Sequence, residues 1–441
     1  MRSLNVFSNS RLVGLLTEDN NLWQFKYDAQ WAGDPSTFDL SPYLQRAPGP
    51  IVDGATERPV QWYFDNLLPE EGLRTAVSRE ARIAEADAFG LLAYLGSESA
   101  GSLILQDPGA DPAPAPGTQE LSDEVLSQRI RDLPRVTLQH SAPKRMSLAG
   151  AQHKLLVIYG GDRICEPVGA TPSTHILKPD HRDKDAYPSS VINEYAMMKL
   201  AASLKLDVPR VYRRYCPEPV YLVERFDRVV HGALPSDASQ TERLQQIDTC
   251  QLLNKDRLYK YSAASLDTLA SVIAHCRSRG PTRVALFRWL AFNLLIGNND
   301  NHIKNISYLI DDEGVRLAPF YDLLSTASYH TRSYAKSEPQ WPSADLAIAL
   351  PRQPRFEDVT RDGLLDAGAA LGLPVQVCSR ELDAMLLGIE PNLDRLIERI
   401  GQANEHLPGH CRTFLGGEMQ LLRTIRHIVV AGMVKKLRGQ A

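Results

Sequence analysis

The sequence lacks several features that would assign it to a broad class at once. Its six cysteines are scattered over 441 residues, without the paired spacing of a zinc site or a disulfide framework, which predicts a reducing environment. No apolar run approaches the ~20 residues that cross a bilayer, and the N-terminus lacks the apolar core of a signal peptide. The net charge of -4 gives no general signature of nucleic-acid binding. These absences predict a cytoplasmic globular protein with no membrane partner, long enough for two or three domains.

Two common nucleotide-binding patterns, the Walker A motif and the G-x-G-x-x-G loop, are also missing. A stretch of small residues at 149–154 instead precedes a predicted strand at 155–159. Such a loop can direct backbone N–H groups at phosphates, although a plain surface loop explains the same residues. The stretch is a candidate phosphate-binding loop only in combination with other features.

Composition divides the chain into four sections. Residues 1–106 alternate predicted strands with helices and form a first unit. Residues 107–119 repeat proline among small residues, which is typical of an extended linker. Residues 120–228 contain three further predicted strands, and residues 229–441 are mostly helical by pattern. We place a domain boundary in the proline-rich stretch.

The strongest chemical signal lies in residues 297–305. This stretch follows an apolar helical run at 284–296 and precedes a predicted β-hairpin around an Asp/Gly turn. A hairpin returns the chain to its starting point, so Asn305 and Asp322 should lie side by side. Asp300 is one tight loop away. The sequence therefore predicts two carboxylates and an amide that converge at one end of a small sheet.

Asp300, Asn305 and Asp322 supply oxygen donors in the order that protein kinases use. Mg²⁺ prefers few protein oxygens, usually one or two carboxylates together with phosphate oxygens. In kinases an Asp accepts the hydroxyl proton, an Asn a few residues later holds one metal ion, and an Asp after the next hairpin holds the other. The alternative is an Asn/Asp-rich surface loop followed by an unrelated aspartate. Spacing alone leaves both interpretations open.

Two upstream features fit the same chemistry. Lys178 ends a predicted strand and Glu194 stands in the following helix, and kinases use such a pair to hold the α- and β-phosphates. Residues 221–228 end another predicted strand, where backbone groups at a hinge between lobes could bind adenine beside Phe226. A solvated lysine, an unrelated surface glutamate and an acid-rich strand end explain these features equally well when each is taken alone.

The last predicted helix, 421–437, carries basic residues without an acid. Such a face could meet nucleic acid or an acidic partner, and a solvated terminal helix is the other interpretation. The basic residues, with Arg438 just past the helix end, are Arg423, Arg426, His427, Lys435 and Lys436.

Taken in this order, the motifs resemble the HipA family, the serine/threonine kinase toxins of bacterial toxin–antitoxin pairs. The resemblance runs over nearly the whole chain. The stretches that carry it are residues 64–69, 147–154, 174–178, 193–195, 223–228, 246–248, 300–305 and 319–322.

The resemblance implies an α+β, bilobal protein-kinase-like fold with ATP and Mg²⁺ as cofactors. Asp300 matches the catalytic base of the family, and Asn305 and Asp322 match its metal ligands. The implied regions are a small N-terminal α/β subdomain (1–106), the linker (107–119), a kinase N-lobe (120–228) and a mostly helical C-lobe (229–441). The residues assigned to ATP are Ala149, Gly150, Ala151, Gln152, His153, Lys154, Lys178, Glu224, Arg225, Phe226, His302, Lys304 and Tyr321.

Ser147 matches the serine whose autophosphorylation expels the nucleotide-binding loop and switches family members off. A phosphate there would compete with the phosphates of ATP for the same donors, and Lys144 and Arg145 could become its new partners. The family also implies three partners: a helix-turn-helix antitoxin (HipB-like), operator DNA reached only through that antitoxin, and a protein substrate such as an aminoacyl-tRNA synthetase.

Two other functions remain compatible with the sequence. A small-molecule or lipid kinase could use the same phosphoryl-transfer geometry, and assays with different acceptors would separate it from a protein kinase. A catalytically idle scaffold could act in corepression with a DNA-binding partner, with the basic terminal helix as the DNA contact. The set of Asp300, Asn305 and Asp322 argues against the scaffold, because a chain released from catalysis need not keep these groups together.

Overall fold

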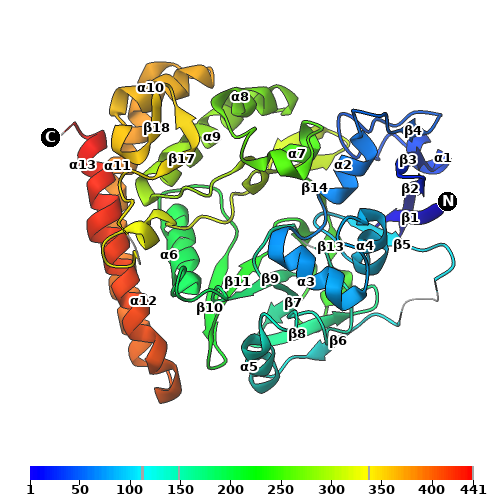
Figure 1. The fold of residues 1–441 in the computed structure, drawn as a ribbon, viewed down its shortest axis with the longest axis horizontal. Helices are drawn as coiled ribbons and strands as arrows, with labels where there is room; N and C mark the ends of the chain where they lie inside the picture. The colour runs from blue at the N-terminus through cyan, green and yellow to red at the C-terminus, as the bar shows by residue number, and fades with distance from the viewer. Residues whose placement is uncertain (111–113, 148, 336–337, 440–441) are drawn as a thin grey trace. The chain divides into compact units, whose positions relative to one another are not determined.

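The structure is a computed structural model that describes residues 1–110, 114–147, 149–335 and 338–439 (Figure 1). The chain forms two compact units, each built from segments that are separated in sequence. The first unit comprises Met1–Lys178, Val223–Tyr259 and Ser307–Ala318, and the second comprises Pro179–Leu222, Lys260–Ile306 and Pro319–Ala441. This division differs from the predicted boundary at residue 228, because the chain crosses between the units more than once.

A five-stranded antiparallel sheet, in the order β4-β3-β2-β1-β5, forms the N-terminal part of the first unit. Alternate residues of β1 are buried, as expected for a strand with one face on a core. Aromatic pairs join β3 to the helices, with ring centroids 5.2 Å apart for Trp23–Phe89 and 5.7 Å apart for Phe25–Phe64. The elements are β1 (Arg2–Ser8), β2 (Arg11–Asp19), β3 (Leu22–Tyr27), α1 (Ala29–Gly33), β4 (Ile51–Val52), α2 (Pro59–Asp65), α3 (Glu71–Ala81), α4 (Ala88–Leu95) and β5 (Leu103–Gln106).

A second sheet of the first unit contains strands in the order β9-β7-β8-β6. Its edge strand corrects one prediction: residues 117–119, assigned to the linker, belong to β6. They pair with β8, and the Gly117 N–H also donates to Oγ1 of Thr171 at 2.8 Å, so backbone pairing holds them in the sheet. Residues 111–113 of the predicted linker lie outside the described residues. The elements are β6 (Gly117–Glu120), α5 (Asp123–Asp132), β7 (Leu155–Gly160), β8 (Arg163–Val168) and β9 (His175–Pro179).

The predicted hairpin after residue 305 is confirmed. β15 and β16 pair antiparallel around a turn at Asp312 and Glu313. β14 adds a third strand beside β15, which the sequence analysis did not predict. The elements of this region are β12 (Arg228–Val229), η1 (Ala238–Gln240), β13 (Glu242–Arg243), β14 (Gln245–Asp248), α7 (Thr249–Leu252), η2 (Arg257–Lys260), β15 (Ser307–Asp311) and β16 (Gly314–Leu317).

The second unit is mostly helical. α12, the π-helical segment η7 and α13 follow one another without a break and form one rod (Figure 1). The elements are α6 (Ser190–Ser203), β10 (Val211–Tyr215), β11 (Pro219–Glu224), α8 (Leu266–His275), α9 (Arg279–Ile296), η3 (Ile303–Asn305), η4 (Ala327–His330), β17 (Asp345–Leu350), β18 (Gln353–Arg355), η5 (Phe356–Asp358), α10 (Arg361–Ala370), α11 (Val375–Glu405), η6 (Gly409–Cys411), α12 (Arg412–Thr424), η7 (Ile425–Val430) and α13 (Ala431–Leu437).

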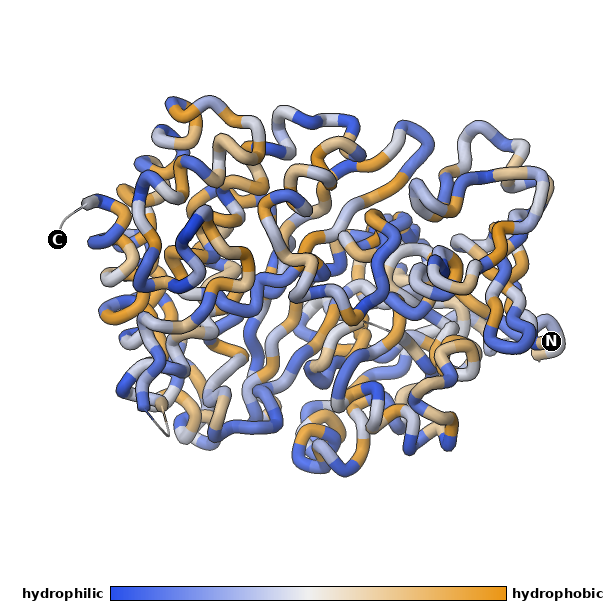
Figure 2. The backbone as a smooth tube through the Cα atoms, turned by 45° about the horizontal axis from the view of Figure 1, so that its top comes forward, coloured by the Kyte–Doolittle hydropathy of each residue, from blue (hydrophilic) through white to orange (hydrophobic). Residues whose placement is uncertain are grey.

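The apolar run at 284–296 forms the C-terminal two-thirds of α9, and its last seven residues are all buried. Leu286 and Leu290 are fully buried, as predicted for a helix that seats in a core. All six cysteines are free and buried, in agreement with the predicted absence of a disulfide framework. Short hydrophobic stretches alternate with hydrophilic ones along the tube in Figure 2, and among the described helices none is long and apolar enough to cross a membrane.

The basic residues of the terminal rod are partly neutralised by neighbouring helices. The Arg426 guanidinium contacts Asp394 at 2.7 Å and Glu390 at 2.9 Å. Arg438 also reaches Glu390, at 3.6 Å, and Lys436 donates to the backbone carbonyl of Glu357. These contacts favour the interpretation of a solvated structural helix over that of a DNA-binding face.

A buried histidine on β9 gives the fold a pH dependence. His175 Nδ1 lies 2.8 Å from Thr174 Oγ1, and its ring meets Tyr159 edge to face at 5.5 Å. Burial disfavours the imidazolium and lowers the pKa of His175 from 6.5 to about 4. The folded chain therefore keeps this ring neutral at pH values where the unfolded chain protonates it.

This difference predicts acid destabilisation that a substitution should remove. One part of the unfolding free energy depends on a neutral His175 ring. This part is fully present above pH 6.5 and is lost as the pH falls toward about 4. We expect the advantage of the wild type over His175→Gln in unfolding free energy to shrink across this window, measured by urea denaturation at several pH values. A constant difference would show that the ring titrates alike in both states.

Candidate active site

The candidate site begins where α9 ends. Gly297 closes the helix in the left-handed conformation with φ of +65°, which favours glycine. A Cβ at this position would lie 2.6 Å from Cγ1 of Val429 and 3.1 Å from Cβ of Ala327. The tight end of α9 thus fixes where the chain enters the loop of residues 298–302.

Side-chain amides and a hydroxyl hold this loop in place. Asn298 donates from Nδ2 to Oδ1 of Asn293 at 2.8 Å, and its own Oδ1 accepts the N–H of Asp300 at 3.0 Å. The N–H of Asn299 donates to Oγ1 of Thr326 at 2.7 Å. The side chains of Asn298 and Thr326 therefore fix the backbone of this loop on the N-terminal side of Asp300.

Asp300 and Asn305 are in direct contact. The Asp300 carbonyl accepts the N–H of His302 at 2.9 Å and the Asn305 Nδ2 amide at 3.0 Å. Because Nδ2 of Asn305 is engaged, its Oδ1 is the atom left to coordinate a cation. The five-residue spacing noted in the sequence thus corresponds to one closed turn.

The segment after the hairpin returns to the same loop. The Tyr321 hydroxyl donates to the carbonyl of Lys304 at 2.8 Å. Asp322 adopts a φ of +53°, an uncommon conformation that aspartate tolerates better than most residues and that often occurs at functional sites. The predicted return of Asp322 toward the Asp300 loop is consistent with these contacts.

A buried tyrosine connects Asp322 with Glu194. Burial is the main cause that raises the pKa of Tyr221 well above its usual range, and the charges of Glu194 and Asp322 raise it further. Glu194 on α6 therefore lies near the same hydroxyl as Asp322. The predicted partner of Glu194, Lys178, is buried at the end of β9 in the first unit, and their pairing stays a prediction.

The described residues contain no group of three or more His, Cys, Asp or Glu side chains arranged to hold a metal ion. A site that places one carboxylate and one amide on Mg²⁺, with phosphate oxygens completing its shell, does not need such a group.

The predicted nucleotide-binding loop lies in the first unit and is held by residues 69 and 70. Gly150 forms a parallel bridge with Pro69, and its carbonyl accepts the N–H of Glu70 at 3.2 Å. The φ of +104° at Gly150 is available to glycine and strained for other residues. Lys154 Nζ donates to the carbonyl of Ala149. Leu148 lies outside the described residues.

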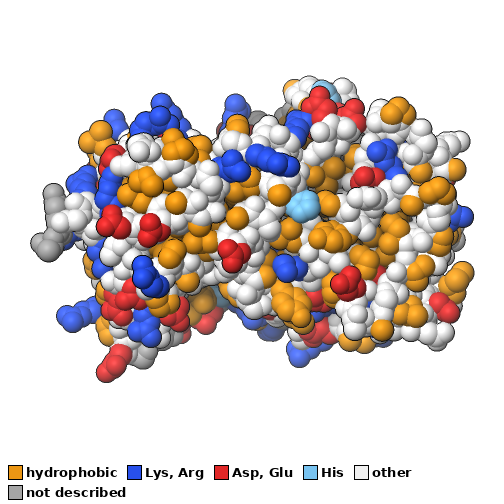
Figure 3. Space-filling model, turned by 90° about the horizontal axis from the view of Figure 1, so that it is seen from above, with side chains coloured by type: hydrophobic (Ala, Val, Ile, Leu, Met, Phe, Trp, Pro, Cys, Tyr) orange, Lys and Arg blue, Asp and Glu red, His pale blue; other side chains and the backbone are white. Residues whose placement is uncertain are grey.

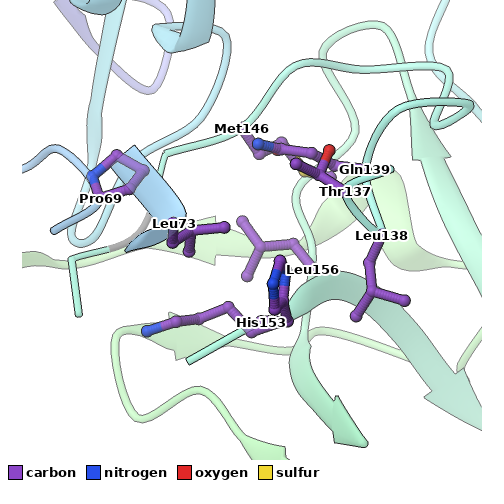
Figure 4. Close-up of a pocket in the computed structure, with 9 residues that line it drawn as sticks. Pro69, Leu73, Thr137, Leu138, Gln139, Met146, His153 and Leu156 are labelled. Atoms are coloured by element: carbon purple, nitrogen blue, oxygen red, sulfur yellow. The ribbon is translucent and has the colours of Figure 1, made fainter. Parts of the chain in front are cut away.

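His153 contributes its side chain to the core of the first unit. Its ring lines a small cavity and lies between Leu73 and Leu138 in Figure 4. The cavity has both apolar and polar walls, and it is lined by Pro69, Leu73, Thr137, Leu138, Gln139, Met146, His153, Lys154 and Leu156. The assignment of His153 to ATP is therefore restricted to its backbone, because its buried ring faces this cavity.

Ser147 is also buried, with an exposed fraction of 1%. Its hydroxyl donates to the carbonyl of Leu67 at 2.7 Å, and its N–H donates to the carbonyl of Glu98 at 2.7 Å. Lys144 forms a buried ion pair with Glu98 at 2.9 Å. In the unphosphorylated chain Glu98 holds the ammonium group of Lys144, so the prediction that Lys144 becomes a partner of a phosphate on Ser147 stays a prediction and requires this ion pair to break.

Arg225, predicted among the ATP-binding residues, is buried, and its side chain forms ion pairs in the interior. Its guanidinium contacts Asp227 at 2.7 Å and Glu98 at 3.3 Å, and its N–H donates to the carbonyl of Thr174 at 2.9 Å. Its carbonyl is the backbone group that remains for a nucleotide, so the predicted backbone contact of Arg225 with adenine stays a prediction. Glu224 and Phe226, on either side, are half-buried.

One residue at the site was missed by the sequence analysis. The hydroxyl of Tyr261 donates to Oδ1 of Asp300 at 2.6 Å, across 39 residues of sequence. No spacing rule connects two residues so far apart. The sequence offers a weak signal at most, two tyrosines at positions 259 and 261 just ahead of α8.

Comparison with known proteins shows the fold and the family of this chain. The mixed sheets and helices match a chain of the solved complex of Shewanella oneidensis MR-1 HipA, HipB and operator DNA, with a TM-score of 0.74 at 24% identity, covering 99% of this chain and 97% of that one. The fold is thus the α+β, kinase-like fold. The chain is a protein kinase, as its sequence relatives show: they are named a putative kinase and a serine/threonine-protein kinase.

The family follows from the sequence matches. The HipA-like C-terminal domain matches residues 146–386, and the HipA N-terminal domain matches residues 4–106. The "Putative kinase Y4mE" of Sinorhizobium fredii is 35% identical over 75% of this chain and 78% of its own length. The serine/threonine-protein kinase toxin HipA of Shewanella oneidensis is 28% identical over 74% and 76%. The chain belongs to the HipA family.

Proposed function

We propose that this kinase transfers the γ-phosphate of ATP, with Mg²⁺, to serine or threonine hydroxyls of proteins, and that it is the toxin of a toxin–antitoxin pair. The observation that carries the proposal is the contact between Asn305 Nδ2 and the Asp300 carbonyl, 3.0 Å long. This contact sets a catalytic-base candidate and a metal-ligand candidate side by side.

The oxygen donors fit the proposed cofactors. Asn305 Oδ1 and the Asp322 carboxylate would hold Mg²⁺, which neutralises charge on the phosphates during transfer. Lys178 would bind the phosphates from β9, and the backbone of residues 149–154 would cover them. Asp300 would accept the proton of the substrate hydroxyl. His302, Lys304 and Tyr321 would surround the nucleotide, as the resemblance implies.

Self-inactivation at Ser147 is part of the proposal. The Ser147 hydroxyl is the donor in its contact with Leu67, and a phosphoserine oxygen has no proton to donate. A phosphate also adds up to about two negative charges, which a fully buried position does not accommodate without a partner. Phosphorylation would therefore require the segment of Ser147 to leave its present position, and the nucleotide-binding loop that follows would leave with it.

The partners are proposed from the relatives. One relative is named a kinase toxin, and the matched solved structure contains HipB and operator DNA. We propose a HipB-like helix-turn-helix antitoxin for this chain, with DNA reached through it, and an aminoacyl-tRNA synthetase as a candidate substrate in the cytoplasm. Positive and negative side chains are interspersed on the face in Figure 3, which gives no reason to expect direct DNA binding there.

The proposal is tested with purified, dephosphorylated protein, labelled ATP and Mg²⁺. We expect label on serine or threonine of protein acceptors and none on small hydroxyl compounds or lipid vesicles. Transfer to a small molecule instead would indicate a small-molecule or lipid kinase. Absence of both ATP binding and transfer would support the corepressor scaffold.

A further inference from the structure

The contact of Tyr261 with Asp300 stands out because it joins a side-chain hydroxyl directly to the carboxylate of the proposed base. Its length of 2.6 Å is typical of a charge-assisted bond from a hydroxyl to an ionised carboxylate. The backbone of Asp300 is fixed independently, at its N–H by Asn298 and at its carbonyl by His302 and Asn305. These backbone contacts do not fix the two side-chain torsions of Asp300.

The surroundings of Tyr261 indicate that its hydroxyl, and not burial of its ring, accounts for a tyrosine at this position. The residue is 49% exposed, so burial of its ring does not explain a tyrosine here. The ring meets His302 edge to face at 4.9 Å, and Lys260 Nζ lies 5.2 Å from the ring centroid. The substitution Tyr261→Phe keeps the ring and therefore both ring contacts, and it removes only the hydroxyl.

We propose that Tyr261 is a positioning residue for phosphoryl transfer: it binds Oδ1 of Asp300 and leaves Oδ2 to face the substrate. The inference rests on the proposed function, because it assumes that Asp300 is the base. In the step, the substrate hydroxyl passes its proton to Oδ2, its oxygen bonds to the γ-phosphorus of ATP, and the bond from that phosphorus to the β-γ bridging oxygen breaks. ADP keeps the electron pair.

Loss of the contact between Tyr261 and Asp300 should lower kcat and leave nucleotide binding unchanged. Tyr261 makes its contact with the base, and a base acts only when the hydroxyl proton moves. Without the Tyr261 hydroxyl, the carboxylate samples other torsions and Oδ2 faces the substrate for a smaller fraction of the time. The KM for ATP should then stay the same while kcat falls.

The test compares Tyr261→Phe with Tyr259→Phe, an exposed tyrosine two residues upstream that serves as the matched control. We expect kcat of Tyr261→Phe to fall about tenfold at unchanged KM for ATP, and Tyr259→Phe to behave as wild type. Circular dichroism and thermal unfolding verify that both variants fold.

Three outcomes decide the matter. An unchanged or raised kcat in Tyr261→Phe, beside an active wild type, overturns this inference and leaves the proposed function in place. A fall in kcat that comes with an equal rise in the KM for ATP assigns Tyr261 to binding and also overturns it. If the wild type and Asp300→Asn are equally inactive with every acceptor, the proposed function itself fails.

Discussion

Asp300→Asn is expected to lower the rate of phosphoryl transfer by about 10²- to 10⁴-fold, the usual contribution of a positioned general base. An asparagine amide keeps the size of the side chain and cannot take the substrate proton. The anchors of the loop should survive, because Asn298 binds the N–H of residue 300 and Asn305 binds its carbonyl. Affinity for ATP is therefore expected to stay close to that of the wild type.

The measurement is the initial rate of transfer at saturating ATP, with ATP affinity determined separately by calorimetry. Asp312→Asn is the matched control, because Asp312 is exposed in the turn between β15 and β16. The control should retain full activity. A fully active Asp300→Asn enzyme would remove Asp300 from the chemistry, and with it the role of Tyr261.

The largest effect on stability is expected from Glu98, whose exposed fraction is 0%. Burial by itself raises the pKa of this carboxyl, and four cations outweigh burial and hold the pKa well below its usual range. The cations are Lys144, Arg228, Arg225 and Arg243. Asp227, the other acid of the cluster, lies against Arg225 and Arg228. Glu98 is thus needed to balance a buried excess of positive charge.

Removing that charge should be costly. We expect Glu98→Gln to lose about 3–5 kcal/mol of unfolding free energy, the usual cost of leaving buried charges uncompensated. Because the native pKa is depressed, the wild-type advantage should decline as the pH falls below the ordinary range of a carboxyl. Urea denaturation at neutral and acidic pH measures both effects.

Glu242→Gln provides the comparison, since Glu242 is exposed and pairs only loosely with His231 at 3.8 Å. An exposed pair of this kind contributes about 0–1 kcal/mol. If Glu98→Gln is as stable as this control at neutral pH, the buried cluster is not balanced by Glu98 as the contacts indicate.

The parts of the fold that local patterns determine were predictable. The apolar period of α9 and the Asp/Gly turn of the β15–β16 hairpin each depend on neighbouring residues. The contact of Asn305 with Asp300 lies within one turn of chain, so its spacing could be interpreted before the structure.

Contacts between distant segments were not predictable in the same way. Glu98 meets Arg225 across 127 residues and Tyr261 meets Asp300 across 39. Nothing in a single sequence indicates that the side chain of Arg225 turns inward. Its place in the predicted hinge suggested instead that Arg225 contacts a nucleotide. β14 is a four-residue strand whose pairing with β15 depends on the hairpin being formed.

The proposed self-inactivation of this kinase at Ser147 can be measured by intact-mass spectrometry after incubation with ATP and Mg²⁺. The wild type is compared with Asp300→Asn and Ser147→Ala. We expect a single added phosphate on the wild type that maps to Ser147 and is absent from both variants. A wild-type chain that stays unmodified and does not bind ATP would contradict this expectation.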